Sequence, residues 1–515
     1  MKGRLNMKKR ALAFSLFLLM LALSLCACNV EGNDNSGNVS DGTGGNTFFG
    51  LALPENLNYK GRTVKVLSTA TNDDWSYQIQ PASNPNYSAD TASGIVTAAA
   101  ERTRLVEERL GVNIEEEVVY TSNRYGGEMY QRIISDMAIG KGDYLFCMPA
   151  STEAAMLSTE GVLLDLTTVE TLDITKPWWS QSFNEKVAIA GSVYFTIGDI
   201  GYVNKNATLF VAFNKAMVEE NHLAEDYGYA SLYEMVDEGA WTQDVMFAMS
   251  KAVYQDLNEN NKSDVGDILG FAQQDGVIAC LLSGAGETIA TPDADGYPSL
   301  TIKNERAISL ISDAQEFLQN PQSGFISAND YFNVSGVPVS DVIVPEFKAD
   351  RLLFLMEAVL NLPLLRDMEN DFGVLPTPKY DKEQEEYFSR IGGWSCDTIC
   401  IPSFVEGEDL EVAGYVLDAL GAASRANLNY VYYEQTLQYQ ISRDDESMRM
   451  LDIIFESRIP DMCEIYRWGT MYDTVIGMYK AGKDTFVSAY EKAEPGTIEE
   501  MEQTIEIFKS LQEND

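Results

Sequence analysis

Hydrophobic and polar positions alternate between a strand-like and a helix-like period in the first part of the chain after residue 58. The predicted strands and helices are, in order, 63–69, 94–110, 112–120, 127–140 and 143–149. This βαβαβ order with short connections predicts a parallel sheet with helices on its faces. Ligands of such sheets bind beyond the carboxyl ends of the strands, which here are Thr69–Trp75 and Met148–Thr152.

A second series of strands and helices begins after residue 208. Its predicted elements are a strand at 209–214, a helix at 244–257 and strands at 268–273, 371–380 and 394–403. From Asp409 the pattern is mostly helical to the end of the chain. This pattern predicts two α/β units followed by a helix-rich part. The chain, including its N-terminal leader, has 515 residues, a length that fits more than one domain.

The N-terminus has the pattern of an export signal. Several cations up to Arg10 precede the apolar run Ala11–Leu25, which is shorter than the about 20 residues that a membrane span needs. The sequence LCACN then resembles a bacterial lipobox. Cys28 is the preferred lipidation site, because Cys26 would place the bulky Leu25 at the cleavage point. An ordinary secretory signal with incidental cysteines is the alternative.

The segment after the lipobox is rich in Gly, Asn, Ser and Asp and has almost no apolar residues. It cannot bury enough surface to offset its ordering entropy, so residues 28–49 are predicted to be a flexible tether. A lipid anchor, a tether and a globular body together predict a protein held on the extracytoplasmic face of a cell membrane.

Charge and cysteine usage exclude several classes of function. The net charge of −41 disfavours binding to nucleic acid and to anionic lipid, both of which attract Lys and Arg. The single histidine, His222, makes a His-based zinc site or a His-dependent nucleophile improbable. No phosphate-binding or dinucleotide-binding glycine motif is present, so no organic cofactor is expected. The body cysteines show no disulfide framework and are predicted to be buried thiols: Cys147, Cys280, Cys396, Cys400 and Cys463.

Several phrases resemble, in order, the carbohydrate-type (family 1) extracellular solute-binding lipoproteins of ABC importers. They are GVLLDL, LFVAFNKAMVEE, EGAWTQDVMFAMSKAV, FKADRLLFLM and FGVLPTPKYD, and they lie between residues 60 and 470. One departure is Asp350, which stands where glycine is usual in that family. The pair Trp178–Trp179 in KPWWSQSF is similar to a clostridial-type branch of the family.

The resemblance implies an α/β, two-lobe, periplasmic-binding-protein-like (Venus-flytrap) fold with hinge crossings and a helix-rich C-terminal part. The implied segments are a signal peptide at 1–27, the tether at 28–49, lobe 1 at 50–207 plus 395–428, and lobe 2 at 208–394 plus 429–515. It also implies a ligand held between the lobes without catalysis, an ABC permease and ATPase as partners, and a monomer. Hinge closure would then remove water from the ligand.

Aromatic and carboxylate side chains near predicted strand ends are the candidate ligand-binding residues. Flat aromatic faces and hydroxyl-accepting oxygens suit a sugar, so a sugar or oligosaccharide is the predicted ligand. The candidates are Asp74, Trp75, Trp178, Trp179, Asp199, Glu357, Trp394 and Tyr433.

Each of the candidate positions also has a purely structural interpretation. Trp75 could be a loop anchor and Asp199 a turn cap, whereas Glu357, a charge inside an apolar run, could pair with Arg351 or Arg366. Because neighbouring residues of an extended segment point to opposite sides, one tryptophan of the 178–179 pair is expected in the core and the other toward the cleft.

The stretch DLNENNKSDVGD (256–267) resembles the calcium loop of an EF-hand. The oxygen donors expected at the ligand positions are Asp256, Asn258, Asn260, Lys262 (by its carbonyl), Asp264 and Asp267. Asn261 replaces the usual glycine and Asp267 the usual glutamate, and a strand is predicted where a sensor would have its second helix. The prediction is a structural Ca²⁺ site; the alternative is an Asn/Asp-rich turn without metal.

Other functions remain open at this point. A binder of the same fold could take a peptide, an amino acid or a polyamine instead of a sugar. A cell-surface glycosidase would need two carboxylates about 5 to 9 Å apart, and among 78 acidic residues such a pair is easily found by chance. A calcium-dependent adhesin is disfavoured, because only one such loop and no repeat are present.

Overall fold

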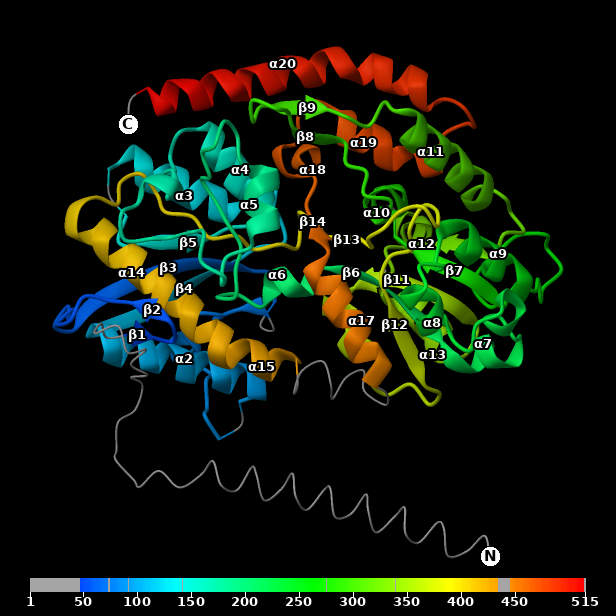
Figure 1. The fold of residues 1–515 in the computed structure, drawn as a ribbon, viewed down its shortest axis with the longest axis horizontal. Coiled ribbons are helices and arrows are strands. Elements are labelled where there is room, and N and C mark those ends of the chain that lie inside the picture. The colour runs from blue at the N-terminus through cyan, green and yellow to red at the C-terminus, as the bar shows by residue number, and fades with distance from the viewer. Residues whose placement is uncertain are drawn as a thin grey trace, which may run out of the picture.

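The computed structural model describes residues 47–72, 75–90, 92–140, 142–274, 276–338, 340–433 and 445–513. Its strands fall mainly into two separate sheets, one on each side of the short helix α6 (Val203–Asn206) (Figure 1). The proposed lipidation site Cys28, the signal segment and Asp74 lie outside the described residues. The two-lobe architecture predicted from the sequence is confirmed, and the lobe boundaries stay a prediction.

Lobe 1 is built on a three-stranded parallel sheet in the order β4–β3–β5. The strands are β3 (Arg62–Ala70), β4 (Val112–Tyr120) and β5 (Phe146–Met148). The helices of this lobe are α2 (Gly94–Leu110), α3 (Glu128–Ala138), α4 (Ser151–Thr159), α5 (Gln181–Val187) and α14 (Gly407–Ala423). Two small strands, β1 (Thr47–Phe48) and β2 (Leu51–Ala52), form a hairpin before β3.

The local sequence explains where α2 begins and ends. The Ser93 side chain accepts a hydrogen bond from the backbone N–H of Val96, and Gly111 ends the helix in the left-handed conformation at φ 65°. Val106 and Leu110 of the helix pack against the sheet residues Val64 and Ile114, all of them buried. The βαβ order therefore follows from caps and apolar periodicity, as the sequence predicted.

Lobe 2 is built on a five-stranded sheet in the order β10–β7–β11–β6–β12. The strands are β6 (Leu209–Asn214), β7 (Leu269–Gln273), β10 (Phe325–Ser327), β11 (Leu352–Ala358) and β12 (Phe372–Leu375). The helices that cover it are α7 (Lys215–Glu220), α8 (Leu232–Asp237), α9 (Gln243–Val253), α10 (Val277–Gly284), α11 (Glu305–Leu318), α12 (Ala328–Ser335) and α13 (Ser340–Lys348). The hairpin of β8 (Ala290–Pro292) and β9 (Pro298–Leu300) extends from this lobe.

Strand β11 is central in lobe 2: it runs parallel to β7 and antiparallel to β6. Trp241 packs beside it at 5.3 Å from Phe354, fully buried, and donates its indole N–H to the carbonyl of Pro376 at 2.9 Å. Trp241 therefore belongs to the core of lobe 2.

The chain passes between the lobes at α6 and returns near Trp394. Before the return, β13 (Ser389–Arg390) pairs in parallel with β14 (Arg458–Ile459). The predicted strand at 394–403 is observed only as single bridges to lobe 1, such as Cys147 with Cys400 and Thr196 with Ile399. No continuous strand forms because the bridges go to three separate segments of lobe 1, near residues 147–150, 163 and 196, and none of these segments pairs with two consecutive residues.

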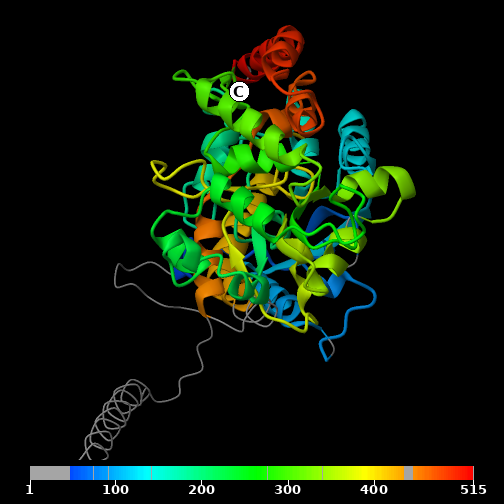
Figure 2. The same cartoon turned by 90° about the vertical axis from the view of Figure 1, so that its right-hand side faces the viewer.

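The C-terminal part is helical, as predicted: α15 (Asn429–Val431), α17 (Asp445–Glu456), α18 (Met462–Tyr466), α19 (Met471–Ile476) and α20 (Phe486–Gln512). Figures 1 and 2 show α20 lying along one side of the molecule, over both lobes. Its Phe508 ring contacts Tyr194 of lobe 1 at 4.8 Å, and its Glu491 pairs with Lys303 of lobe 2 at 3.0 Å.

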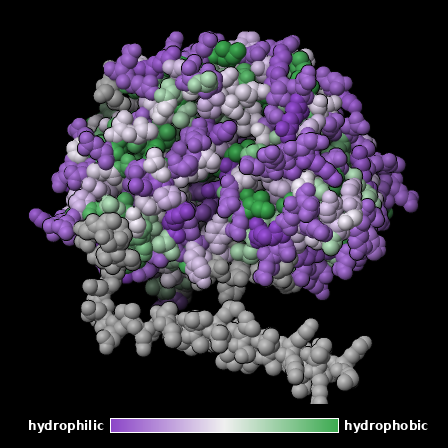
Figure 3. Space-filling model, in the orientation of Figure 1, coloured by the Kyte–Doolittle hydropathy of each residue, from purple (hydrophilic) through white to green (hydrophobic). Residues whose placement is uncertain are grey.

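The surface carries the strongly negative charge of the sequence. The face in Figure 3 is mostly hydrophilic, with small separate apolar areas. Among the described residues no helix is both long enough and apolar enough to cross a membrane.

Candidate ligand-binding cleft

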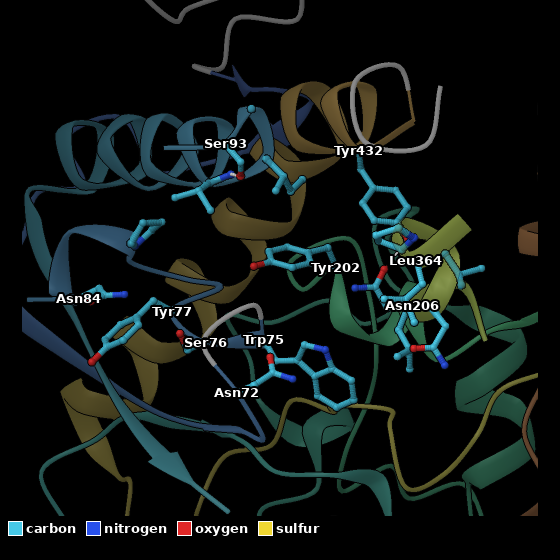
Figure 4. Close-up of a pocket in the computed structure, with 18 of the residues that line it drawn as sticks. Asn72, Trp75, Ser76, Tyr77, Asn84, Ser93, Tyr202, Asn206, Leu364 and Tyr432 are labelled. Atoms are coloured by element: carbon cyan, nitrogen blue, oxygen red, sulfur yellow. Dashed lines mark hydrogen bonds between the residues drawn. The ribbon is translucent and has the colours of Figure 1, made fainter. Parts of the chain in front are cut away.

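A cavity of about 690 Å³ lies between lobe 1, helix α6 and lobe 2 (Figure 4). Its described lining residues are Asn72, Trp75, Ser76, Tyr77, Pro81, Asn84, Tyr87, Ser93, Gly94, Ile95, Val96, Tyr202, Asn206, Val359, Leu360, Asn361, Pro363, Leu364, Arg366 and Tyr432. A volume of this size is typical of small-molecule sites. The lining combines aromatic rings and amides with one cation and, among the described residues, no carboxylate.

The topology explains why these segments meet at the cavity. Asn72 and Trp75 follow the carboxyl end of β3, and the turn of 3₁₀ helix Val359–Leu365 follows the carboxyl end of β11. Strands that run parallel within a sheet present their carboxyl ends at one edge, where ligands of open α/β sheets bind. The two edges face each other across α6, which contributes Asn206.

Two tryptophans form an aromatic corner at this site. The rings of Trp75 and Trp394 lie 6.1 Å apart at an angle of 63°, in an edge-to-face arrangement. The Arg124 guanidinium is 5.5 Å from the centre of the Trp75 ring and 5.6 Å from that of Trp394. The structure thus brings together two of the predicted site residues, and Arg124 supports both.

Arg124 also forms a buried ion pair with Asp397, and neither side chain is more than 1% exposed. Gln78 donates its amide N–H to the other carboxylate oxygen of Asp397 at 2.9 Å. Burial raises the pKa of Asp397, although Arg124 and Gln78 oppose that rise. Among the described residues, the Nε and Nη1 atoms of Arg124 have no hydrogen-bond partner, and buried Glu153 also interacts electrostatically with the guanidinium.

The predicted residue Asp199 belongs to a charge network at the first crossing. Its carboxylate accepts hydrogen bonds from Lys205 at 3.2 Å and from Arg425 at 3.3 Å. Burial alone would raise the pKa of Asp199, but Lys205, Asn429 and Arg425 together hold it below its ordinary value. In this conformation Asp199 ties α6 to the end of α14, and it does not line the cavity.

Tyr432 closes the cavity beside the same network. Its hydroxyl donates a hydrogen bond to the side chain of Asn206 at 2.8 Å, and its ring lies 5.8 Å from the Lys205 ammonium. The predicted residue Tyr433 is half-buried and packs edge-on against Tyr432 and Phe455 at 6.0 and 5.5 Å. Tyr432, rather than Tyr433, lines the cavity.

Glu357 lies at the end of β11, buried behind the cavity residue Asn361. One of its oxygens accepts the Ala358 N–H at 2.9 Å. Burial raises the pKa of Glu357, whereas hydrogen bonds from Ala358, Asn361 and Gln274 lower it. The suggested pairing with Arg351 is wrong, because Arg351 pairs with Glu346 at 2.8 Å.

The expectation that one of Trp178 and Trp179 faces the cleft is wrong for this structure. Both are buried in lobe 1, at 4% and 2% exposure, and both donate their indole N–H to the same oxygen of Asp418 at 2.9 Å. A Cβ atom at Gly421 would lie 2.3 Å from the Trp178 ring, so glycine allows the close packing of α14 there. A shared carboxylate acceptor from a distant helix keeps both rings in the core.

Most residues of the cavity wall were not predicted from the sequence. Tyr77, Asn84 and Tyr87 lie in the connection between β3 and α2, which runs from residue 71 to 93. A connection this long, rich in Tyr, Asn and Ser, is itself a functional signal, since loops longer than about 12 to 15 residues are uncommon in compact domains. No comparable feature of the sequence around Tyr202 and Asn206 indicated that they would line a cavity.

The loop from Asp256 to Asp267 is ordered by its own side chains. The Asp256 carboxylate accepts the backbone N–H groups of Asn260 and Asn261 at 3.2 and 2.6 Å. Buried Asp267 accepts those of Leu257 and Asp264 at 3.0 and 3.1 Å.

Asn261 has a φ of 62°, the left-handed geometry that the sixth position of a calcium loop requires. Among the described residues, no group of three or more His, Cys, Asp or Glu side chains is placed to hold a metal ion. Calcium binding therefore stays a prediction.

Comparison with solved structures supports the two-lobe fold. Similar chains include the galacto-N-biose/lacto-N-biose I-binding protein of an ABC transporter from Bifidobacterium longum (TM-score 0.55, 11% identity, covering 86% of this chain and 98% of that one). A second similar chain is a cyclo/maltodextrin-binding protein (TM-score 0.53, 13% identity, covering 86% of this chain and 99% of that one). A third is an ABC substrate-binding protein from Listeria monocytogenes in complex with cycloalternan (TM-score 0.52, 11% identity, covering 86% of this chain and 99% of that one).

No protein-family model and no curated protein matches the sequence. At these identities the likeness is one of fold. The chain has the two-lobe architecture of the substrate-binding proteins of ABC transporters.

Proposed function

We propose that this protein is a lipid-anchored extracellular solute-binding protein that captures a sugar or oligosaccharide and delivers it to an ABC import permease. The observation that carries the proposal is the interlobe cavity of about 690 Å³, lined by aromatic rings and amides at the facing strand ends. The fold supports it, because the similar solved structures are described as sugar-binding proteins.

The chemistry of the cavity wall favours a sugar over a cation. Trp75, Tyr77 and Tyr87 offer flat faces to the apolar side of a sugar ring, and Asn72, Asn84, Asn206 and Asn361 can both donate to and accept from hydroxyl groups. A polyamine would need carboxylates, yet the described lining residues include none and do include Arg366.

Ligand binding would act by shifting the balance between open and closed lobes. The cavity wall combines residues of lobe 1, such as Trp75, with residues of lobe 2, such as Asn361. A ligand that touches both walls binds the closed form more tightly and so increases its population. The single crossing helix α6 and the return near Trp394 are where such a hinge would bend.

The same wall disfavours hydrolysis, which is the main alternative from another class. Glycosidases place two carboxylates on either side of the bond they cleave. Among the described residues that line the cavity there is no Asp or Glu. We therefore infer binding without chemical conversion. The proposal also includes a lipid anchor at Cys28, a monomer, and permease and ATPase partners, all of which the sequence resemblance implies.

Thermal denaturation with a panel of sugars tests this function. A sugar that binds is expected to stabilise the protein by about 2.7 kcal/mol at 100 times its dissociation constant and to be recovered unchanged by chromatography. Peptides, amino acids and polyamines serve as matched panels. Stabilisation only by a peptide, an amino acid or a polyamine would show that the ligand is not a sugar. New products in the mixture would show that the protein is an enzyme.

We also propose that the loop 256–267 takes up Ca²⁺. In this structure Asp256 accepts the backbone N–H groups of Asn260 and Asn261, and Asp264 accepts the side-chain amides of Asn258 and Asn260. A bound ion would take the place of these hydrogen bonds. Added Ca²⁺ is expected to raise Tm, and a chelator is expected to reverse the change. Asp256→Ala should remove this response, whereas Asp293→Ala in another polar turn should keep it. Equal Tm values with and without Ca²⁺ would show a metal-free turn.

A further inference from the structure

Two cysteines far apart in the sequence lie directly opposite each other in lobe 1. Cys147 belongs to β5, and Cys400 belongs to the segment that returns from lobe 2. The backbone N–H of each donates to the carbonyl of the other, at 2.9 and 3.0 Å. This is a hydrogen-bonded antiparallel pair, in which the two Cα atoms are about 5.5 Å apart and both side chains point to the same face of the sheet.

The Cα separation of such a pair lies within the range of a disulfide. Bridged cysteines have Cα atoms roughly 4.4 to 6.8 Å apart. Burial raises the pKa of the Cys147 thiol well above its ordinary value, and hydrogen bonding to the Cys400 thiol raises it further, so the two sulfur groups face each other. Both residues are fully buried.

The other buried cysteines have different neighbours. The Cys280 thiol lies 3.5 Å from the Gln273 amide and 3.9 Å from Arg390. The Cys396 thiol lies 3.9 Å from the carbonyl of Asp397. Among the described cysteines, Cys147 and Cys400 are the two that stand opposite each other in a backbone bridge.

We propose that Cys147 and Cys400 form a disulfide when the chain folds in the presence of a disulfide oxidant. A thiolate of one cysteine attacks a small-molecule disulfide RSSR, which gives a mixed disulfide and releases RSH. The thiolate of the second cysteine then attacks the protein sulfur of the mixed disulfide and releases the second RSH. Two thiols are oxidised and one RSSR is reduced to two RSH.

The place of this bond in the chain gives it a structural role. The segment between Cys147 and Cys400 contains the first crossing, the body of lobe 2 and the return near Trp394. The bond would fasten both ends of this long insertion to lobe 1 and restrict the unfolded chain. Because both thiols are buried, where an oxidant cannot reach them, we expect the bond to form during folding and only slowly in the folded protein.

Peptide mapping of the wild-type chain tests the proposal without any substitution. The protein is unfolded, refolded with oxidised and reduced glutathione, unfolded again and alkylated before digestion. The expected product is one peptide pair joined through Cys147 and Cys400, with Cys280, Cys396 and Cys463 alkylated. Alkylation of all five, or a cross-link through another cysteine, would overturn the proposal. The result is independent of ligand binding, so it does not depend on the proposed function.

Melting temperatures provide the second measurement. The cross-linked protein is expected to unfold a few °C above the fully reduced protein, as is usual for a disulfide that closes a long loop. Cys396→Ala should keep this difference, because Cys396 is not the cross-strand partner. Cys400→Ala should abolish it, and the wild-type peptide map decides the matter if that variant refolds poorly.

Discussion

Asp397→Ala is expected to lower the free energy of unfolding by about 3 to 5 kcal/mol. The substitution leaves the guanidinium of Arg124, which is fully buried, without its counter-charge. Gln78 would also lose its acceptor at 2.9 Å. Chemical denaturation at neutral pH measures the loss.

Two controls separate the buried charge from a general effect of substitution. Arg104→Ala removes exposed pairs with Glu101 and Glu108, and it should cost no more than about 1 kcal/mol. The double variant Arg124→Met with Asp397→Leu removes both charges and should recover most of the lost stability. A loss below about 1 kcal/mol for Asp397→Ala would mean that water or another group compensates Arg124.

Trp75→Ala is expected to weaken sugar binding by roughly 30-fold or more, which corresponds to about 2 kcal/mol at a central aromatic contact. Trp75 is the tryptophan that lines the cavity, and its ring is held between Arg124 and Trp394. Removing the indole takes away a flat face for the sugar and leaves Trp394 without its partner. Titration calorimetry, with the sugar that gives the largest rise in Tm, measures the change.

The design must distinguish lost contact from lost folding. Trp75→Phe keeps an aromatic face and should retain part of the affinity. Tyr227→Ala removes an exposed ring in lobe 2, away from the cavity, and should leave the dissociation constant unchanged. Circular dichroism at the titration temperature confirms that each variant is folded. An unchanged dissociation constant for folded Trp75→Ala would place the ligand outside this cavity.

Local sequence patterns were enough to predict most of the helices and strands. The predicted elements 94–110, 112–120 and 209–214 agree with α2, β4 and β6 residue for residue. Strand 112–120 begins with alternating buried and exposed residues, 209–214 is a short apolar run that ends at an asparagine, and α2 has a serine cap and a terminal glycine. The run FKADRLLFLMEAVL was harder to assign, since apolar residues on both faces give no period. It contains β11, which is buried because it is the central strand of its sheet.

The site was predictable only where a residue type carried information by itself. Trp75 and Trp394 were proposed because flat aromatic side chains near strand ends suit a sugar. The structure places their rings 6.1 Å apart, and Trp75 lines the cavity. The Trp178–Trp179 pair raised the same expectation and proved to be core. Nothing in the local sequence shows that Asp418, on a helix more than two hundred residues later, accepts a hydrogen bond from both.

The sequence by itself determined the order of strands and helices, the two α/β units and the placing of polar and aromatic residues after the strands. Those properties depend on periodicity and caps within a few residues. Only the tertiary structure decided that Asp397 pairs with Arg124 and that Cys147 faces Cys400. It also decided that Asp199 forms ion pairs with Lys205 and Arg425. These contacts join residues from separate strands and crossings, and they depend on how the chain returns from lobe 2 to lobe 1, which no local pattern encodes.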